Sequence, residues 1–257
     1  MSVDDLKEER LRIPVDDDEL DAVAVSPSQG THRWAILVHG GPGGVKDGPA
    51  DLYRDLAGVL AAQGIGSLRF DVRGAGQSTG AYRDMTLARQ VRDLRAAREL
   101  LAERYAPRRT ALIGESLGAT IVLAGLDGEE DTLVLLWPAI WLLEDVFDSY
   151  LTEESLAEAS ERGFIVRDGE EIGLPFLNEL LATRDVAGPL RGSRTPLLLV
   201  HGDADTEVPV EQSARAEALV AGPVRRVVVP GGEHCLERPS ERAVVNRETS
   251  AWLAAHL

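Results

Sequence analysis

Short apolar runs recur along this chain of 257 residues, and they constrain its fold more than any other feature. Most of them are almost continuously apolar over four to six residues, which is typical of strands buried on both faces of a parallel sheet. Stretches with helical spacing of apolar residues separate them, at 51–62, 86–104 and 240–256. Ser240, after Pro239, is the expected N-cap of the last helix. The predicted strands are residues 34–38, 65–70, 110–113, 132–136, 196–200 and 226–229, preceded by a hairpin of residues 11–14 and 20–25. This alternation predicts an α/β fold with a mostly parallel, eight-stranded sheet between helices.

One long segment interrupts this alternation. Residues 139–191 exceed the length of a simple crossover, and six of the twelve aromatic residues lie between positions 137 and 176. We interpret 139–191 as a cap inserted into a core of residues 1–138 and 192–257, with a helix at 141–162 and a small hairpin at 163–169. The aromatic side chains either form the cap's own core or line an apolar substrate site. The candidates for substrate contact are Trp137, Trp141, Phe147 and Phe164.

The charge and cysteine content exclude several classes of partner and site. Aspartate and glutamate outnumber lysine and arginine by 43 to 27, which gives a net charge of −16. Such a chain repels nucleic-acid phosphates and anionic membranes, and no apolar run approaches the ~18 residues of a membrane span. The single cysteine, Cys235, supports neither a disulfide framework nor a cysteine metal site. The first residues lack the features of a secretory signal. We expect a cytoplasmic monomer or homodimer with no cofactor and no metal.

The most informative motif is Gly114-Glu115-Ser116-Leu117-Gly118. It follows a predicted strand and precedes the helical run 119–124. In a G-x-S-x-G motif with this context, a sharp strand-to-helix turn lifts the serine hydroxyl above the sheet. Small residues two positions before and after the serine are needed because the strand and the helix crowd each other. The motif therefore predicts Ser116 as a nucleophile.

A serine hydroxyl is a weak nucleophile at neutral pH and needs a base and an acid that orients the base. His234 follows the last predicted strand, which places it at the carboxyl edge of the sheet. The segment 201–209 follows another strand and offers Asp203, Asp205 and Glu207. We favour Asp205 because it lies deep enough in the loop to reach the histidine, and we expect Asp203 to brace the turn. The order serine, aspartate, histidine along the chain differs from the chymotrypsin and subtilisin orders.

An oxyanion formed at the serine needs N–H donors already in place. The N–H of Leu117, directly after the nucleophile, is one candidate. The other is Gly41 in the glycine-rich loop 39–44, where the backbone can approach a substrate oxygen closely. His39 and His201 each follow a strand directly, and we expect them to bond the backbone of their turns.

Neither glycine-rich loop matches a nucleotide-binding motif. Loop 39–44 lacks the Lys-Ser/Thr ending of a phosphate-binding loop, and the stretch 70–80 has Thr79 where a G-x-G-x-x-G motif would have its last glycine. The chain also contains no HExxH zinc motif.

Taken together, HGGPGG, FDVRGAGQS, GESLG, HGDADTEVP and GGEHCL resemble the motifs of the α/β-hydrolase superfamily. The resemblance covers residues 20–138 and 192–257. Within the superfamily the chain is similar to small serine carboxylesterases related to feruloyl (cinnamoyl) esterases and to serine aminopeptidase-type hydrolases. The resemblance implies a catalytic triad of Ser116, Asp205 and His234. It also implies an oxyanion hole formed by the N–H groups of Gly41 and Leu117. It also implies structural roles for Asp71 and Arg73.

The expected function is hydrolysis of small-molecule carboxylic esters with apolar or aromatic groups, through an acyl-enzyme. One alternative on the same triad is a peptidase, amidase, thioesterase or acyltransferase, and another is a ligand-binding protein of the same fold. An aminopeptidase would need acids in the cap to recognise a free amino terminus, and the candidates are Glu144, Asp145, Glu153 and Glu154. Glu115 stands where related esterases commonly have histidine, so it places a charge beside the nucleophile.

Overall fold

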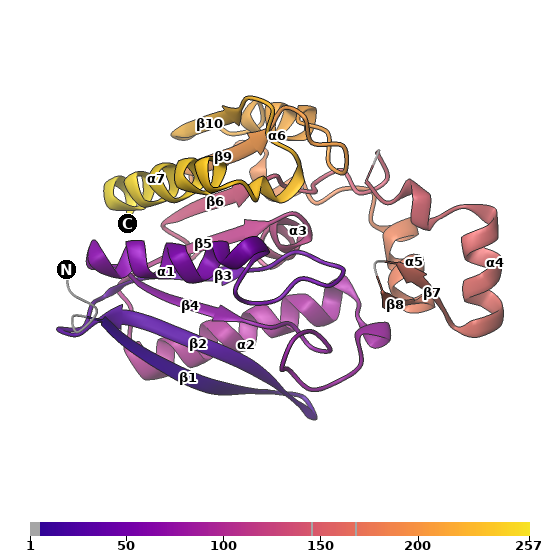
Figure 1. The fold of residues 1–257 in the computed structure, drawn as a ribbon, viewed down its shortest axis with the longest axis horizontal. Coiled ribbons are helices and arrows are strands. Elements are labelled where there is room, and N and C mark those ends of the chain that lie inside the picture. Colours follow the sequence, from indigo (N-terminus) through magenta and orange to yellow (C-terminus); the bar gives the residue numbers. More distant parts are fainter. Residues whose placement is uncertain (1–5, 145, 168) are drawn as a thin grey trace.

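An eight-stranded sheet forms the centre of the molecule (Figure 1). The computed structural model describes residues 6–144, 146–167 and 169–257. The strands lie in the order β1-β2-β4-β3-β5-β6-β9-β10. β1 and β2 form an antiparallel hairpin and β2 pairs antiparallel with β4, whereas the remaining neighbours are parallel. The bounds are β1 Leu6–Val15, β2 Asp18–Pro27, β3 Arg33–Val38, β4 Gly66–Phe70, β5 Arg109–Glu115, β6 Thr132–Leu136, β9 Leu197–Gly202 and β10 Val224–Val229. The predicted α/β fold with a mostly parallel sheet is confirmed.

Two helical layers cover the sheet, and the strands are apolar on both faces for that reason. In β3, Ala35 and Leu37 pack toward α1 (Leu52–Ala62) and α7 (Pro239–His256). Trp34, Ile36 and Val38 belong to the core on the opposite face, which includes α2 (Leu87–Tyr105) and α3 (Leu117–Ala124). A further short helix, α6 (Glu211–Glu217), lies between β9 and β10 in the chain. None of the helices in the described ranges is long and apolar enough to cross a membrane.

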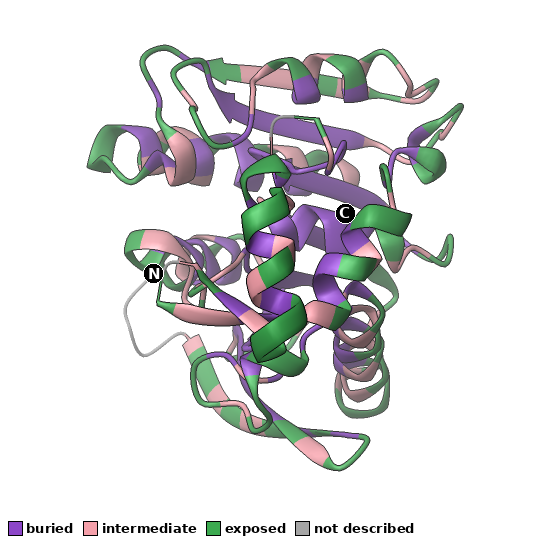
Figure 2. Cartoon of the chain, turned by 90° about the vertical axis from the view of Figure 1, so that its right-hand side faces the viewer, coloured by how far each residue is buried: buried purple, intermediate pink, exposed green. Residues whose placement is uncertain are grey.

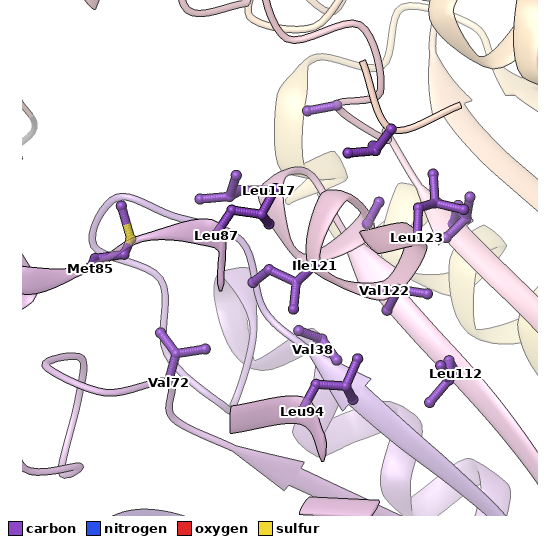
Figure 3. Packing of buried hydrophobic residues seen from close by; sticks show 14 of the residues in the cluster. Val38, Val72, Met85, Leu87, Leu94, Leu112, Leu117, Ile121, Val122 and Leu123 are labelled. Carbon is purple, nitrogen blue, oxygen red and sulfur yellow. The ribbon is translucent and has the colours of Figure 1, made fainter. Parts of the chain in front are cut away.

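Helix α3 is fixed in place by the core around it. Figure 3 shows Leu117, Ile121, Val122 and Leu123 of this helix among the side chains of the surrounding strands and of α2. Every residue of α3 from Leu117 to Leu123 is buried. Because the N-terminus of α3 directly follows Ser116, this packing fixes the position of the serine.

The predicted helix at 240–256 is present, but the prediction of where it begins was wrong. Helix α7 begins at Pro239, and its N-cap is Arg238 rather than Ser240. Proline is favoured in the first turn because its missing N–H would have no partner inside the helix. The N–H of Arg238 donates to the Glu241 carboxylate, which closes the first turn.

The segment 139–191 lies between β6 and β9, and its middle part lies beside the sheet (Figure 1). It contains η4 (Asp148–Tyr150), α4 (Glu153–Arg162), the antiparallel strands β7 (Phe164–Arg167) and β8 (Glu170–Gly173), and α5 (Leu174–Ala182). The prediction of one helix over 141–162 was wrong in its first half. Thr152 starts α4 because its hydroxyl accepts a hydrogen bond from the Ser155 N–H. The predicted hairpin is confirmed, although it extends to residue 173.

Polar contacts attach this segment to the core. The Glu179 carboxylate of α5 accepts hydrogen bonds from the N–H groups of Leu87 and Ala88, at the N-terminus of α2. These N–H groups have no partner inside their own helix, and a carboxylate suits the positive end of the helix dipole. Arg83, in the loop before α2, also pairs with Glu171 of β8 at 2.8 Å. Figure 2 shows that α4 faces solvent, and only Ser155 and Ala159 of this helix are buried.

Buried ion pairs tie the loops at the carboxyl end of the sheet to the N-terminal hairpin. Lys46 lies 2.7 Å from Asp21 of β2 and 2.8 Å from Asp71, whose side chain is fully buried. Arg73 pairs with Asp93 of α2 and with Asp16 in the hairpin turn, at 2.6 Å each. Burying such charges is tolerated only where each is paired. Asp71 and Arg73 therefore hold the loop after β4 against β2 and α2.

We predict that Gly118→Ala destabilises the fold. A Cβ at this position would lie less than 3.0 Å from the carbonyl oxygens of Val38 and His39, and such overpacking costs about 1–3 kcal/mol. The control is Gly58→Ala in α1, where a Cβ would meet open space, with an expected gain of about 0.5–1 kcal/mol. Urea unfolding measures both effects. A Gly118→Ala variant as stable as the wild type would contradict the predicted crowding.

Candidate active site

Ser116 occupies a strained turn between β5 and α3. Its backbone has φ 50° and ψ −121°, a conformation that costs a non-glycine residue about 1–3 kcal/mol. A Cβ at Gly114 would lie less than 3.0 Å from the backbone of Gly118, and a Cβ at Gly118 would overlap with the backbone of β3. Small residues are therefore required on both sides of the serine, as the spacing of the motif indicates.

The structure brings Ser116, His234 and Asp205 together, although the first two lie 118 residues apart in the chain. The Ser116 hydroxyl donates to His234 Nε2 at 3.1 Å. His234 Nδ1 donates to Asp205 Oδ2 at 2.8 Å. These distances lie within the range of a nucleophile, a base and an acid that orients the base.

The Asp205 carboxylate is held by three further donors. Its Oδ1 accepts from the N–H groups of Glu207 and Val208, at 2.9 and 2.8 Å. Its Oδ2 lies 3.2 Å from Nε2 of His201, a fully buried histidine at the end of β9. Burial raises the pKa of Asp205, but hydrogen bonds from His201 and His234 outweigh burial and hold the pKa well below its usual value. Asp205 therefore stays ionised at neutral pH.

His201 does more than the sequence predicts. As expected, its Nε2 faces a backbone carbonyl, that of Val208, at 3.0 Å. The same nitrogen also faces Asp205, so His201 helps to position the acid. The spacing of four residues between His201 and Asp205 in one loop is the only sequence signal for this role. Asp203, by contrast, accepts a hydrogen bond from the Gly231 N–H at 2.6 Å, so it connects its loop to the loop after β10.

The charge state of His234 is set by opposing effects. Burial lowers the pKa of the imidazole, whereas the hydrogen bond to Asp205 and the charges of Asp205, Glu207 and Glu115 raise it. The net result is a pKa above the ordinary value. The neighbouring thiol of Cys235 has a pKa well above its usual value, because it is buried and faces several carboxylates. Cys235 therefore stays a thiol and does not compete with Ser116.

The glycine-rich loop after β3 presents its backbone beside Ser116. Within the described part of the chain, the N–H groups of Gly41 and Leu117 make no hydrogen bond to the protein. The loop is held by His39, whose Nδ1 donates to the Gly40 carbonyl at 2.6 Å while its Nε2 accepts from the Val72 N–H at 3.1 Å. Two N–H donors beside a nucleophile are the components of an oxyanion hole.

The Glu115 side chain holds this loop by a hydrogen bond to its backbone. One carboxylate oxygen accepts from the Gly40 N–H at 2.7 Å, and the other accepts from the indole N–H of Trp137 at 3.0 Å. The carboxylate is buried and both of its oxygens are used. Glu115 therefore links the nucleophile turn to the glycine-rich loop.

A cavity of about 800 Å³ opens over Ser116. The glycine-rich loop lines it through residues 40–44, and the segment 139–191 contributes residues 146–150 together with Arg167. Glu207, Cys235 and Glu237 line the part of the cavity near His234. The cavity is therefore lined both by core loops and by part of the segment 139–191.

The structure places one of the four predicted aromatic contacts in this cavity. Phe147 lines it, together with Tyr150, which was not predicted. Trp137 is fully buried beneath the site, where it bonds Glu115, so it forms part of the core. Trp141 is buried under the guanidinium of Arg215. Phe164 contacts the guanidinium groups of Arg162 in α4 and of Arg83 in the loop before α2. Aromatic composition indicated an apolar unit, but it did not indicate which side chains face inward.

Among the described residues, no group of three or more His, Cys, Asp or Glu side chains is arranged to hold a metal ion.

Similarity to known proteins agrees with this architecture. A family model described as "Serine aminopeptidase, S33" matches residues 35–162. The structure of Est1E from Butyrivibrio proteoclasticus with ferulic acid bound has the same fold, with a TM-score of 0.81 at 20% identity, over 96% of this chain and 98% of that chain. The chain has the α/β-hydrolase fold.

Two curated relatives of this chain are longer proteins. An uncharacterized protein of Mycobacterium tuberculosis is 33% identical over 202 residues, which cover 78% of this chain and 62% of the relative. Esterase EstD of Thermotoga maritima is 28% identical over 207 residues, which cover 72% of this chain and 50% of the relative. The chain thus spans about three fifths and one half of the lengths of these relatives.

We predict that the His234 imidazole of this protein titrates above the ordinary imidazole value. Asp205→Asn removes the hydrogen-bonded charge that raises the pKa and leaves burial, which lowers it. The pKa of His234 should therefore fall in this variant. NMR titration of the imidazole signals measures the change. Asp203→Asn is the matched control, because Asp203 lies in the same loop but bonds Gly231. An unchanged His234 pKa in Asp205→Asn would contradict the assignment.

Proposed function

We propose that the protein is a serine hydrolase that cleaves carboxylic esters through an acyl-enzyme. The observation that carries this proposal is the continuous hydrogen-bonded series from the Ser116 hydroxyl through His234 to the ionised Asp205. The named relative Esterase EstD, and the ferulic acid bound to Est1E, support a carboxylic ester as the substrate.

In the acylation step, Ser116 Oγ forms a bond to the ester carbonyl carbon while His234 Nε2 takes the hydroxyl proton. The carbonyl oxygen becomes an oxyanion and accepts hydrogen bonds from the N–H groups of Gly41 and Leu117. The bond to the leaving oxygen then breaks, and His234 gives its proton to the departing alcohol. Asp205 stabilises the imidazolium during this step and holds the ring in the correct orientation.

Deacylation repeats these steps with water. His234 takes a proton from a water molecule, whose oxygen bonds to the acyl carbon, and the same N–H groups hold the second oxyanion. Collapse of this intermediate breaks the bond to Ser116 Oγ, which recovers its proton from His234. The products are a carboxylic acid and the free serine.

The cavity favours uncharged substrates with an apolar group. Phe147, Tyr150 and Val146 contribute apolar surface to its lining. The carboxylates of Glu207 and Glu237 line the same cavity and would repel an anionic substrate. We propose neutral esters of small to medium size, with an aromatic or aliphatic group against Phe147.

Recognition of a peptide amino terminus has less support. Of the acids considered for that role, Glu144 forms an ion pair with Arg215, and Glu153 and Glu154 lie exposed in the first turn of α4. None of these three lines the cavity. Asp145 lies outside the described residues.

We expect Ser116→Ala to lose ester hydrolysis by about 10³- to 10⁶-fold, because the nucleophile is removed while the fold is kept. Release of p-nitrophenol from p-nitrophenyl butyrate measures this loss. The control is Ser213→Ala, because the Ser213 hydroxyl donates to the Val210 carbonyl and the residue does not line the cavity. Retention of more than a few per cent of activity in Ser116→Ala would refute the mechanism, as would fluorophosphonate labelling at another residue.

A second prediction concerns the bond that is cleaved. With matched acyl groups, p-nitrophenyl esters should be hydrolysed faster than thioesters, and aminoacyl anilides should be the poorest substrates. The reason is that the nitrogen of an amide is a poorer leaving group than the oxygen or sulfur of the other two series. Steady-state kcat/KM values for the three series test this order. Faster cleavage of aminoacyl anilides would overturn the ester preference but leave the serine mechanism intact.

A further inference from the structure

The hydroxyl of Tyr82 has no hydrogen-bond partner among the residues that the structure describes. Tyr82 begins a short 3₁₀ helix, η3 (Tyr82–Asp84), in the loop after β4, and the residue is 6% exposed. Among the described residues, its Oη is buried and makes no hydrogen bond. An orphaned hydroxyl of this kind costs about 1–3 kcal/mol, and phenylalanine would fill the same volume without that cost. The hydroxyl therefore calls for a partner outside the folded chain.

The position of this hydroxyl indicates what the partner is. A Cβ on Gly41 would lie less than 3.0 Å from Tyr82 Oη and 3.7 Å from Cδ2 of Leu117. The hydroxyl thus occupies the space that a side chain at position 41 would take. The hydroxyl lies beside Gly41, and the side chain of Leu117 lies near the same position. In the proposed mechanism, Gly41 and Leu117 are the two residues whose N–H groups face the substrate. The absence of a side chain at Gly41 is what allows the hydroxyl to approach.

Tyr82 is held in this position from both sides. A Cβ on Gly74 would lie less than 3.0 Å from the backbone of Tyr82, so the preceding loop packs directly against it. On the other side, a Cβ on Gly173 would overlap with the carbonyl oxygen of Arg83. Residue 82 therefore lies between the core and strand β8.

The hydroxyl also keeps its proton. Burial raises the pKa of Tyr82 above the ordinary tyrosine value, and neighbouring Tyr150 and Glu170 add to this. A phenol that stays protonated across the neutral range can donate one hydrogen bond to an oxygen that acquires negative charge.

We propose that the Tyr82 hydroxyl is a third donor to the oxyanion, acting with the N–H groups of Gly41 and Leu117. The proposal rests on the proposed ester hydrolysis. The hydroxyl donates its hydrogen bond as negative charge grows on the carbonyl oxygen in acylation and again in deacylation, and its own O–H bond stays intact. A group of this kind stabilises the transition state more than the bound substrate, so it acts on kcat more than on KM.

Tyr82→Phe tests the proposal, because it removes only the oxygen. We expect kcat for p-nitrophenyl butyrate to fall about 10- to 100-fold with little change in KM. The melting temperature should stay the same or rise, since an unpartnered buried hydroxyl is removed. The matched control is Tyr53→Phe, another fully buried tyrosine, whose hydroxyl donates to the Val38 carbonyl at 3.1 Å. That variant should lose stability and keep kcat.

A trifluoromethyl ketone separates this proposal from the proposed function. Wild-type protein should bind the ketone as a hemiketal of Ser116, whose oxygen mimics the oxyanion, and Tyr82→Phe should bind it about 10- to 100-fold more weakly. Equal kcat and equal ketone affinity in Tyr82→Phe and wild type would overturn the role of Tyr82 while leaving the serine mechanism in place. No hemiketal in the wild type would overturn both.

Discussion

Close contact between the backbones of β3, β5 and α3 is the constraint on which the site depends. Gly114 and Gly118 allow these backbones to approach more closely than any Cβ would permit. The strained backbone of Ser116 follows from this close approach. Because helix α3 is buried along its length, this strain is supported by the core and is not relieved by movement of the turn. The turn exposes the hydroxyl of Ser116 and leaves the N–H of Leu117 at the start of a helix, where the helix dipole favours negative charge.

Much of the core and the site could be predicted from the sequence, for identifiable physical reasons. Strands buried on both faces are continuously apolar, so the predicted runs of the central sheet correspond to β3, β4, β5, β6, β9 and β10. The positions of Ser116, Asp205 and His234 could be predicted because the carboxyl ends of parallel strands meet at one edge. The role of His201 could not, since a histidine beside a turn gives no indication of which neighbour its second hydrogen bond reaches.

The segment 139–191 was the hardest part to predict, because neither the start of its helix nor the direction of its aromatic side chains follows from the spacing of apolar residues. The start of α4 is set by the Thr152 hydroxyl, a local effect that apolar spacing does not reveal. Trp137 and Trp141 are as apolar as Phe147, yet a hydrogen bond to Glu115 and a stacked Arg215 hold them away from the cavity. Tyr53 and Tyr82 show the same limit. Their sequence contexts do not distinguish them, and only the presence or absence of a hydroxyl partner does.

The glycine backbone along one side of the cavity has an evolutionary consequence. A side chain at Gly40, Gly41 or Gly44 would collide with Ser116, with Tyr82 or with the loop itself. These positions therefore tolerate little variation, and a change of substrate is easier through the other lining residues, such as 146–150 and 206–208. Different parts of the chain therefore carry the proposed chemistry and the choice of substrate. The residues that select the substrate can change in evolution while the glycine-rich loop and Ser116 are kept.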